Sequence, residues 1–199
     1  MSDTAGHDAA GAWRELAGQV DGCRACDLGL VRTHAVPGDL PDPYDGGPVP
    51  LLLVGEAPGA DEDALGRPFV GRSGRLLDQL LDEAGLDRTG VAVANVLKCR
   101  PPGNRAPRAR ELAACRPWLH RQLALLQPRV VVTLGGSATT WFFGRGARLT
   151  TLRGRPHEVD GRTVFATYHP SAALRFGPRG APLAGLREDL GTVAGWLAR

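Results

Sequence analysis

A fully apolar run, LLLV at residues 51–54, leads directly into the turn-like segment GEAPG at residues 55–59, and this restricts the fold more than any other feature. A strand with one solvated face alternates apolar and polar residues, whereas a parallel strand covered on both faces is apolar throughout. Two further runs of this kind are VAVANVLK at residues 91–98 and RVVVTLGG at residues 129–136. The chain is therefore predicted to form a mostly parallel sheet that helices cover on both faces.

Stretches of helical periodicity separate these runs, as parallel strands require. Leucines line one face of residues 73–84, and helices are also expected at residues 11–20, at about residues 108–126 and over the C-terminal PLAGLREDLGTVAGWLA. A hairpin around Asp160–Gly161 is expected to lead into a fourth core strand. The predicted fold class is α/β, a three-layer sandwich with a central, mostly parallel four-stranded sheet flanked by helices.

The size of the chain fits one domain. It has 199 residues, of which 43% are hydrophobic and 23% charged, and this suits a soluble protein with a single core. Residues 1–10 are small and polar and are expected to be a disordered tail, with residues 11–199 forming the domain. Apolar runs are too short to cross a membrane and the N-terminus lacks a signal-peptide pattern, so a cytoplasmic protein is expected.

Positive charge comes almost entirely from arginine, because Lys98 is the only lysine among the 24 Lys and Arg residues. Arginine can grip a phosphate with two parallel hydrogen bonds, which lysine cannot do. Codon usage in a GC-rich genome explains the same bias, however, and the net charge of +3 is small. Charge alone therefore does not identify a partner.

Four cysteines are candidates for a metal site: Cys23, Cys26, Cys99 and Cys115. The first two form a C-x-x-C pair, and a disulfide framework is not expected in a reducing cytosol. Four thiolates suit zinc or an iron–sulfur cluster, while buried core cysteines and a redox pair are the alternatives. The spacing alone leaves these interpretations open.

Polar residues follow the predicted strands where each strand ends. Glu56 follows the first strand, Asn95 lies near the end of the second, and His169 follows the fourth. Each alone is more often a loop, turn or core residue, but ligands of open α/β sheets bind beyond the carboxyl ends of the strands. A carboxylate, an amide and an imidazole there suit a water-positioning base, a reader of amide-like edges and a stabiliser of a developing anion. GEAPG has no phosphate-binding signature.

Three longer motifs carry a resemblance to a known family. Together with the four cysteines, GEAPGADEDALGRPFVGRSGRLL (55–77), NVLKCRPPGNRAP (95–107) and YHPSAALR (168–175) resemble a family-four uracil-DNA glycosylase, the iron–sulfur branch of that superfamily. The resemblance covers roughly residues 20–198. It implies a DNA-repair hydrolase that flips uracil out of the duplex, cleaves its bond to deoxyribose and leaves an abasic site.

The resemblance also implies individual roles. Glu56 would position or activate water, and His169 would hydrogen-bond the uracil O2, where negative charge builds. The implied uracil-binding residues are Gly55, Ala57, Phe69, Asn95 and His169, with Phe69 stacking on the ring and Asn95 reading its amide edge. The implied DNA contacts are Arg100, Asn104, Arg105, Ser171, Leu174 and Arg175, and Leu174 or Arg175 would fill the gap left by the flipped base. A structural [4Fe–4S] cluster would bind Cys23, Cys26, Cys99 and Cys115.

Two other functions stay open at this point. One is a covalent or tight uracil-DNA-binding trap of the same superfamily, and the other is a non-catalytic iron–sulfur protein that binds DNA. A sibling class that traps its product carries a histidine in a longer basic loop, and Asn104 stands at the position that matches this histidine. Turnover is therefore predicted. The expected partner is uracil-containing DNA, single- or double-stranded, bound by a monomer, with no membrane partner.

Overall fold

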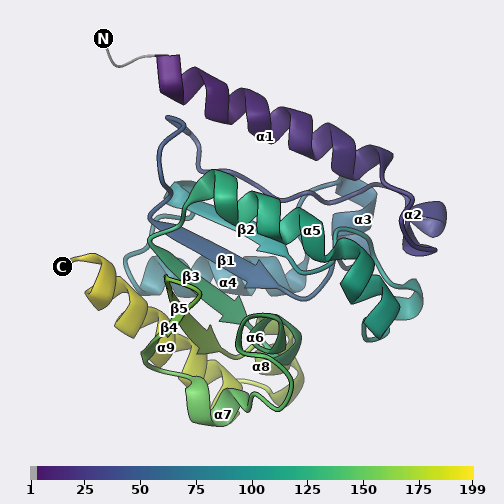
Figure 1. Ribbon diagram of the computed structural model, residues 1–199. Coiled ribbons are helices and arrows are strands. Elements are labelled where there is room, and N and C mark those ends of the chain that lie inside the picture. The colour runs from purple at the N-terminus through teal and green to yellow at the C-terminus, as the bar shows by residue number, and fades with distance from the viewer. Residues whose placement is uncertain (1–3) are drawn as a thin grey trace.

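Five strands form one sheet in the order β2-β1-β3-β5-β4. The computed structural model describes residues 4–199 (Figure 1). The strands are β1 (Leu51–Gly55), β2 (Val91–Asn95), β3 (Val130–Leu134), β4 (Pro156–Val159) and β5 (Arg162–Thr167). All neighbours pair in parallel except β4, which pairs antiparallel with β5. Every residue of β1, β2 and β3 is buried, as expected for strands that are covered on both faces.

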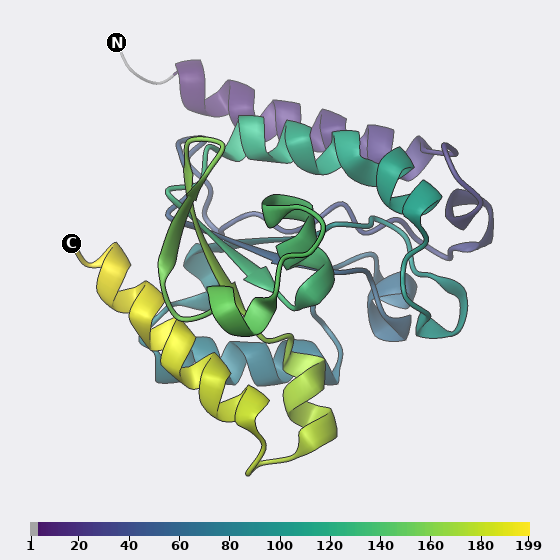
Figure 2. The same ribbon diagram turned by 60° about the horizontal axis from the view of Figure 1, so that its bottom comes forward.

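Helices cover both faces of the sheet. They are α1 (Thr4–Gly22), α2 (Leu28–Val31), α3 (Ala60–Leu65), α4 (Arg72–Glu83), α5 (Ala109–Leu126), α6 (Gly136–Phe143), α7 (Leu149–Leu152), α8 (Pro170–Phe176) and α9 (Ala181–Leu197). Figure 2 shows α1 and α5 side by side on one face and α4, α8 and α9 on the other. Because successive strand residues point to opposite faces, Leu51 and Leu53 belong to the α4–α9 core, whereas Leu52 and Val54 belong to the α5 core.

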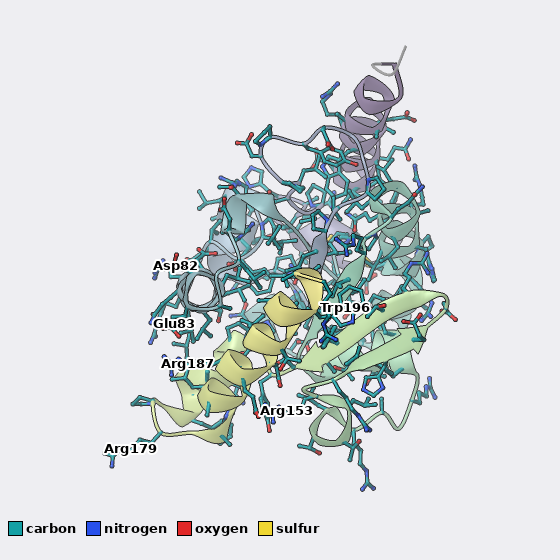
Figure 3. The ribbon with its side chains drawn as sticks, turned by 90° about the vertical axis from the view of Figure 1, so that its left-hand side faces the viewer. Asp82, Glu83, Arg153, Arg179, Arg187 and Trp196 are labelled. Atoms are coloured by element: carbon teal, nitrogen blue, oxygen red, sulfur yellow. The ribbon has the colours of Figure 1, made fainter. Side chains whose placement is uncertain are left out.

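Two ion pairs fix helix α9 to the rest of the domain (Figure 3). Arg187 of α9 bonds Glu83 at the end of α4, with 2.6 Å between Nε and Oε2. Arg153 donates to the buried carboxylate of Asp189, which also accepts the Thr167 hydroxyl at 2.5 Å. Thr167 ends β5 two residues before His169, so this second ion pair anchors the strand end that carries the imidazole.

The predicted fold class is confirmed, with two corrections. The sheet has five strands rather than four, because the first arm of the predicted hairpin is the edge strand β4. Its residues alternate between exposed and half-buried, so this arm lacks the apolar run that marks the other strands. The tail predicted at residues 1–10 is corrected at residues 4–10, where alanine-rich sequence continues α1 as regular helix. Residues 1–3 lie outside the described residues. Among the helices described, none combines the length and apolar character needed to cross a membrane.

Candidate active site

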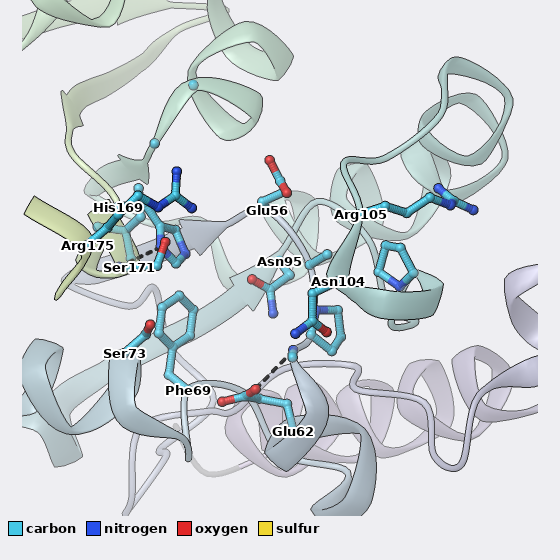
Figure 4. Close-up of a pocket in the computed structure, with 17 residues that line it drawn as sticks. Glu56, Glu62, Phe69, Ser73, Asn95, Asn104, Arg105, His169, Ser171 and Arg175 are labelled. Atoms are coloured by element: carbon cyan, nitrogen blue, oxygen red, sulfur yellow. Dashed lines mark hydrogen bonds between the residues drawn. The ribbon is translucent and has the colours of Figure 1, made fainter. Parts of the chain in front are cut away.

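A cavity of about 460 Å³ opens at the carboxyl ends of the parallel strands (Figure 4). Its walls come from the loops after β1, β2, β3 and β5 and from the start of α4. The predicted residues that line it are Glu56, Ala57, Phe69, Asn95, Asn104, Arg105, His169, Ser171 and Arg175. The structure therefore brings the carboxylate, the amide and the imidazole into one pocket, as expected from the strand ends. Gly55, Arg100 and Leu174 are not among the lining residues.

Asn95 lies at the bottom of this pocket and is only 2% exposed. Its side-chain Oδ1 has no hydrogen-bond partner among the residues described. Gly55 pairs with Asn95 across β1 and β2, and a Cβ at Gly55 would lie 2.4 Å from that oxygen and 2.7 Å from the Phe69 ring. Buried polar atoms are almost always satisfied, so this acceptor is available to a hydrogen-bond donor that enters the pocket. Glycine at 55 makes the required room without lining the cavity itself.

Phe69 closes one side of the pocket, with its ring centroid 5.8 Å from that of His169. Its backbone has φ +54°, an uncommon conformation for a bulky residue. The carboxylate of Glu62 accepts backbone N–H bonds from Gly59, Val70 and Gly71 at 3.0, 2.9 and 2.9 Å, and so shapes the turn on either side of Phe69. Glu62 also lines the cavity. Glu62 was not predicted as a site residue, although Gly59, Gly66, Pro68 and Gly71 around it signalled a tight turn.

Glu56 is held by Ser137, which was not predicted as a site residue. The hydroxyl of Ser137, in the first turn of α6, donates a hydrogen bond to Glu56 Oε2. Eighty-one residues separate the two in the chain. A small hydroxyl residue directly after Gly135–Gly136 was the only local signal. Because the bond occupies one carboxylate oxygen, it orients Glu56 and leaves Oε1 for a ligand or water.

His169 is a neutral imidazole with a defined tautomer. Its Nδ1 accepts the backbone N–H of Ser171 at 3.1 Å and pairs with the Ser171 hydroxyl at 2.8 Å. An Nδ1 that accepts an N–H cannot carry a proton, so the ring proton is on Nε2. Burial lowers the pKa of His169 to about 4, although the charge of Glu62 opposes this shift. The ring therefore offers a neutral N–H donor to the pocket.

This protonation state can be tested by nitrogen-detected NMR of the histidine rings. Because the pKa of His169 falls from 6.5 to about 4 on folding, its ring is expected to stay neutral and Nε2-protonated at pH 6. The unfolded chain binds this proton more readily, so stability should decrease as pH falls from 6.5 toward 4. His157, at the edge strand, serves as the internal comparison. A His169 ring that is half-protonated near pH 6.5 would contradict the assignment.

The basic loop after β2 is more internally bonded than predicted. Asn104 accepts a 2.7 Å hydrogen bond from Arg100. Arg105 makes two hydrogen bonds, of 2.9 and 2.6 Å, with the fully buried Glu111. This pairing lowers the pKa of Glu111 to about 2, so the carboxylate is charged and neutralises Arg105. Arg105 thus helps to fix the loop, and its role as a DNA contact stays a prediction, whereas Arg108 is exposed.

The helix that follows His169 presents apolar side chains to solvent. Leu174 is 39% exposed, and Phe176, which the sequence analysis did not single out, is 65% exposed. Arg175 lies between them and lines the cavity. An apolar residue exposed beside a pocket is what a wedge into a base stack requires.

The four cysteines line a second, small cavity between the C-terminal end of α1 and the first half of α5. Arg32 Nη1 lies 3.0 Å from Cys99 Sγ, and the backbone N–H of Lys98 donates to Cys115 Sγ at 3.3 Å. Over residues 4–199, no three His, Cys, Asp or Glu side chains are gathered closely enough for a single metal ion. In a four-iron cluster each cysteine binds a different iron, so the sulfurs stand further apart than around one ion. Four thiol side chains around one cavity are a donor set that suits either a zinc ion or an iron–sulfur cluster.

Comparison with known proteins agrees with this geometry. The family described as the uracil DNA glycosylase superfamily matches residues 43–191. The chain is 43% identical over 166 residues to a type-4 uracil-DNA glycosylase of Sulfurisphaera tokodaii, covering 78% of this chain and 73% of that protein. It is 44% identical over 159 residues to one of Thermotoga maritima, covering 79% and 80%. Identity to a type-5 uracil-DNA glycosylase of Thermus thermophilus is 36% over 158 residues, covering 65% and 72%.

Proposed function

This chain belongs to the uracil-DNA glycosylase superfamily, and from its pocket and its type-4 relatives we infer that it excises uracil from DNA by hydrolysing the N-glycosidic bond. The observation that carries this inference is the orphaned Oδ1 of Asn95 beside the ring of Phe69. A flat base with an N–H donor on its edge satisfies both features at once. Uracil has this donor at N3, next to the O4 acceptor.

Recognition follows from the pairing of the Asn95 amide with that edge. Oδ1 accepts the N3–H and Nδ2 donates to O4, while Phe69 stacks on the ring. Cytosine offers an acceptor at N3 and a donor at C4, so both hydrogen bonds would be lost and two buried polar groups left unpaired. A site built this way rejects the wrong base strongly. The base must leave the duplex to reach this depth.

His169 and Glu56 have separate roles in hydrolysis: His169 acts on the leaving base and Glu56 on the attacking water. As the bond between N1 and C1′ breaks, its electron pair moves into the uracil ring, and the Nε2–H of His169 donates to O2, where negative charge develops. The sugar becomes oxocarbenium-like, and Glu56, oriented by Ser137, holds a water against C1′ and accepts its proton. The hydroxyl joins C1′, uracil leaves as an anion that takes up a proton, and the abasic site remains.

Turnover rather than trapping is proposed, because Asn104 has no nucleophilic nitrogen that could capture the sugar. The deciding experiment incubates the protein with a uracil-containing oligonucleotide, single- or double-stranded, and then with alkali. Cleavage at the uracil with no denaturant-resistant protein–DNA band is expected. A resistant band would favour the trap, and absence of cleavage on both substrates would refute the enzyme. We place the enzyme in the cytoplasm as a monomer, since its substrate is the genome and one chain contains the whole pocket.

The proposed DNA contact uses the half-buried Arg100 and the exposed Arg108 for phosphates, and Leu174 as the wedge. In Leu174→Ala, uracil release from duplex DNA is expected to fall roughly tenfold, since nothing then fills the gap that opposes flipping. Release from single-stranded DNA should be unchanged, because no stack has to be opened. Leu30→Ala, at a leucine 71% exposed on α2, is the matched control. An equal loss on both substrates would assign Leu174 to the pocket instead.

A [4Fe–4S] cluster is proposed at Cys23, Cys26, Cys99 and Cys115, where it would cross-link α1, the basic loop and α5. When bound, it supplies structural cross-linking, and hydrolysis needs no electron transfer. The purified protein is expected to be brown and to contain iron and sulfide. Cys99→Ser should lower the yield of folded protein, since ligand binding and folding are coupled. A colourless, active protein with stoichiometric zinc would overturn the assignment.

A further inference from the structure

Lys98 is the only lysine of the chain, and it is 1% exposed. Its Nζ donates to the backbone carbonyl of Asn95 at 2.6 Å and to Oε1 of Gln122 at 2.5 Å. Gln122 is itself fully buried in α5 and donates to the carbonyl of Pro37 at 2.6 Å. A buried ammonium is costly even when it is well hydrogen-bonded, and an apolar residue is often as stable in its place. Stability alone therefore does not account for a lysine at this position.

The position of the network indicates a further role for this lysine. Asn95 is the last residue of β2, where the regular ladder of the strand ends. The side chain of Asn95 lines the pocket, while its backbone carbonyl accepts a hydrogen bond from the Lys98 ammonium. Gln122 in turn fixes that ammonium to α5 and to the loop at Pro37. The backbone of Asn95 is therefore fixed through the segment after β2 that carries Lys98, through α5 and through the loop at Pro37.

A lysine suits this place for a geometric reason. Its ammonium is a compact point charge that can lie between two oxygen atoms, whereas the planar guanidinium of arginine is larger and needs a wider space. Every other cation in the chain that is neither histidine nor the N-terminus is arginine. The single exception thus falls in a buried position between two oxygen atoms.

We propose that Lys98, assisted by Gln122, is a positioning residue that aligns Asn95 for uracil recognition. This inference rests on the proposed function. It predicts that loss of the ammonium weakens contact with the base and leaves contact with the DNA backbone intact. A role restricted to supporting the neighbouring Cys99 and Cys115 would weaken both equally.

The test compares Lys98→Met with Arg121→Met, an exposed α5 residue whose guanidinium bonds Gln19 outside the pocket. In Lys98→Met, the inhibition constant of free uracil is expected to rise roughly 10- to 100-fold. A small displacement of a group that contacts the bound molecule has an effect of this order. Affinity for DNA containing a tetrahydrofuran abasic-site analogue, which offers no base to Asn95, should be unchanged. Arg121→Met should match the wild type in both measurements.

A double-mutant cycle on single-turnover rates completes the test. In the Asn95→Ala background, Lys98→Met should have little further effect, because residues that act through one another are not additive. If Lys98→Met does not fold, Lys98→Met/Gln122→Met, which replaces both side chains of the network with apolar ones of similar size, is measured instead. Unchanged uracil inhibition, equal loss of abasic-site affinity, or additive effects with Asn95→Ala would each overturn the proposal. A wild-type protein that neither binds nor releases uracil would refute the proposed function instead.

Discussion

Replacement of Glu56 by glutamine is expected to reduce the single-turnover rate of uracil release roughly 10²- to 10⁴-fold, the range of general acid–base contributions. Glutamine has nearly the same shape and can still accept the Ser137 hydroxyl, but its amide neither takes a proton from water nor stabilises the developing positive charge on the sugar. Affinity for uracil-containing DNA should change little, because Asn95, Phe69 and His169 are untouched.

Ser137→Ala is the comparison that separates orientation from chemistry. It removes the hydrogen bond that holds Glu56 but leaves the carboxylate, so a smaller loss, roughly 10- to 100-fold, is expected for a single hydrogen bond to a charged group. Both variants are measured with one duplex substrate at saturating enzyme. A Glu56→Gln protein within about tenfold of the wild-type rate would contradict the role of the carboxylate as the water-positioning base.

A single methyl group at Gly74 is expected to disable the pocket. The Cβ of an alanine there would lie 1.6 Å from the carbonyl oxygen of Phe69, so the turn that carries Phe69 or the start of α4 must move. The strained φ of Phe69 makes this turn intolerant of such a shift. We expect Gly74→Ala to lower kcat/KM by roughly 10²-fold or more and to lower the free energy of unfolding by about 1–3 kcal/mol, as overpacking does.

The sign of this effect is opposite to the general rule for helices, in which alanine is more favourable than glycine. Gly191→Ala tests that rule in the same protein, because Gly191 is exposed inside α9 and a Cβ there meets nothing within 4 Å. It should stabilise the protein by about 0.5–1 kcal/mol and leave activity unchanged. Urea denaturation measures both free energies, and equal stabilisation by the two substitutions would refute the steric account of Gly74.

Part of this site was predictable because it depends on strand ends. Glu56 and Asn95 stand directly after or at the end of an apolar run, His169 lies two residues after β5, and parallel strands bring such positions to one edge of the sheet. The partners of these groups were not predictable from local sequence. Ser137, which orients Glu56, is 81 residues away along the chain, and Gln122, which fixes Lys98, is 24 residues away.

The sequence by itself determined the class of the fold, the core strands and the polar groups at the ends of these strands. This was possible because a strand that is buried on both faces consists of apolar residues throughout, and such a run is visible in the local sequence. The tertiary structure decided which of these groups are free to act. It paired Arg105 with Glu111 and set the proton of His169 on Nε2 through Ser171. It also left Asn95 Oδ1 without a partner within residues 4–199 and added β4 as a half-exposed edge strand. Each of these depends on which atoms meet across the fold, since hydrogen bonds, desolvation and steric contact act over a few ångströms in space and not along the chain.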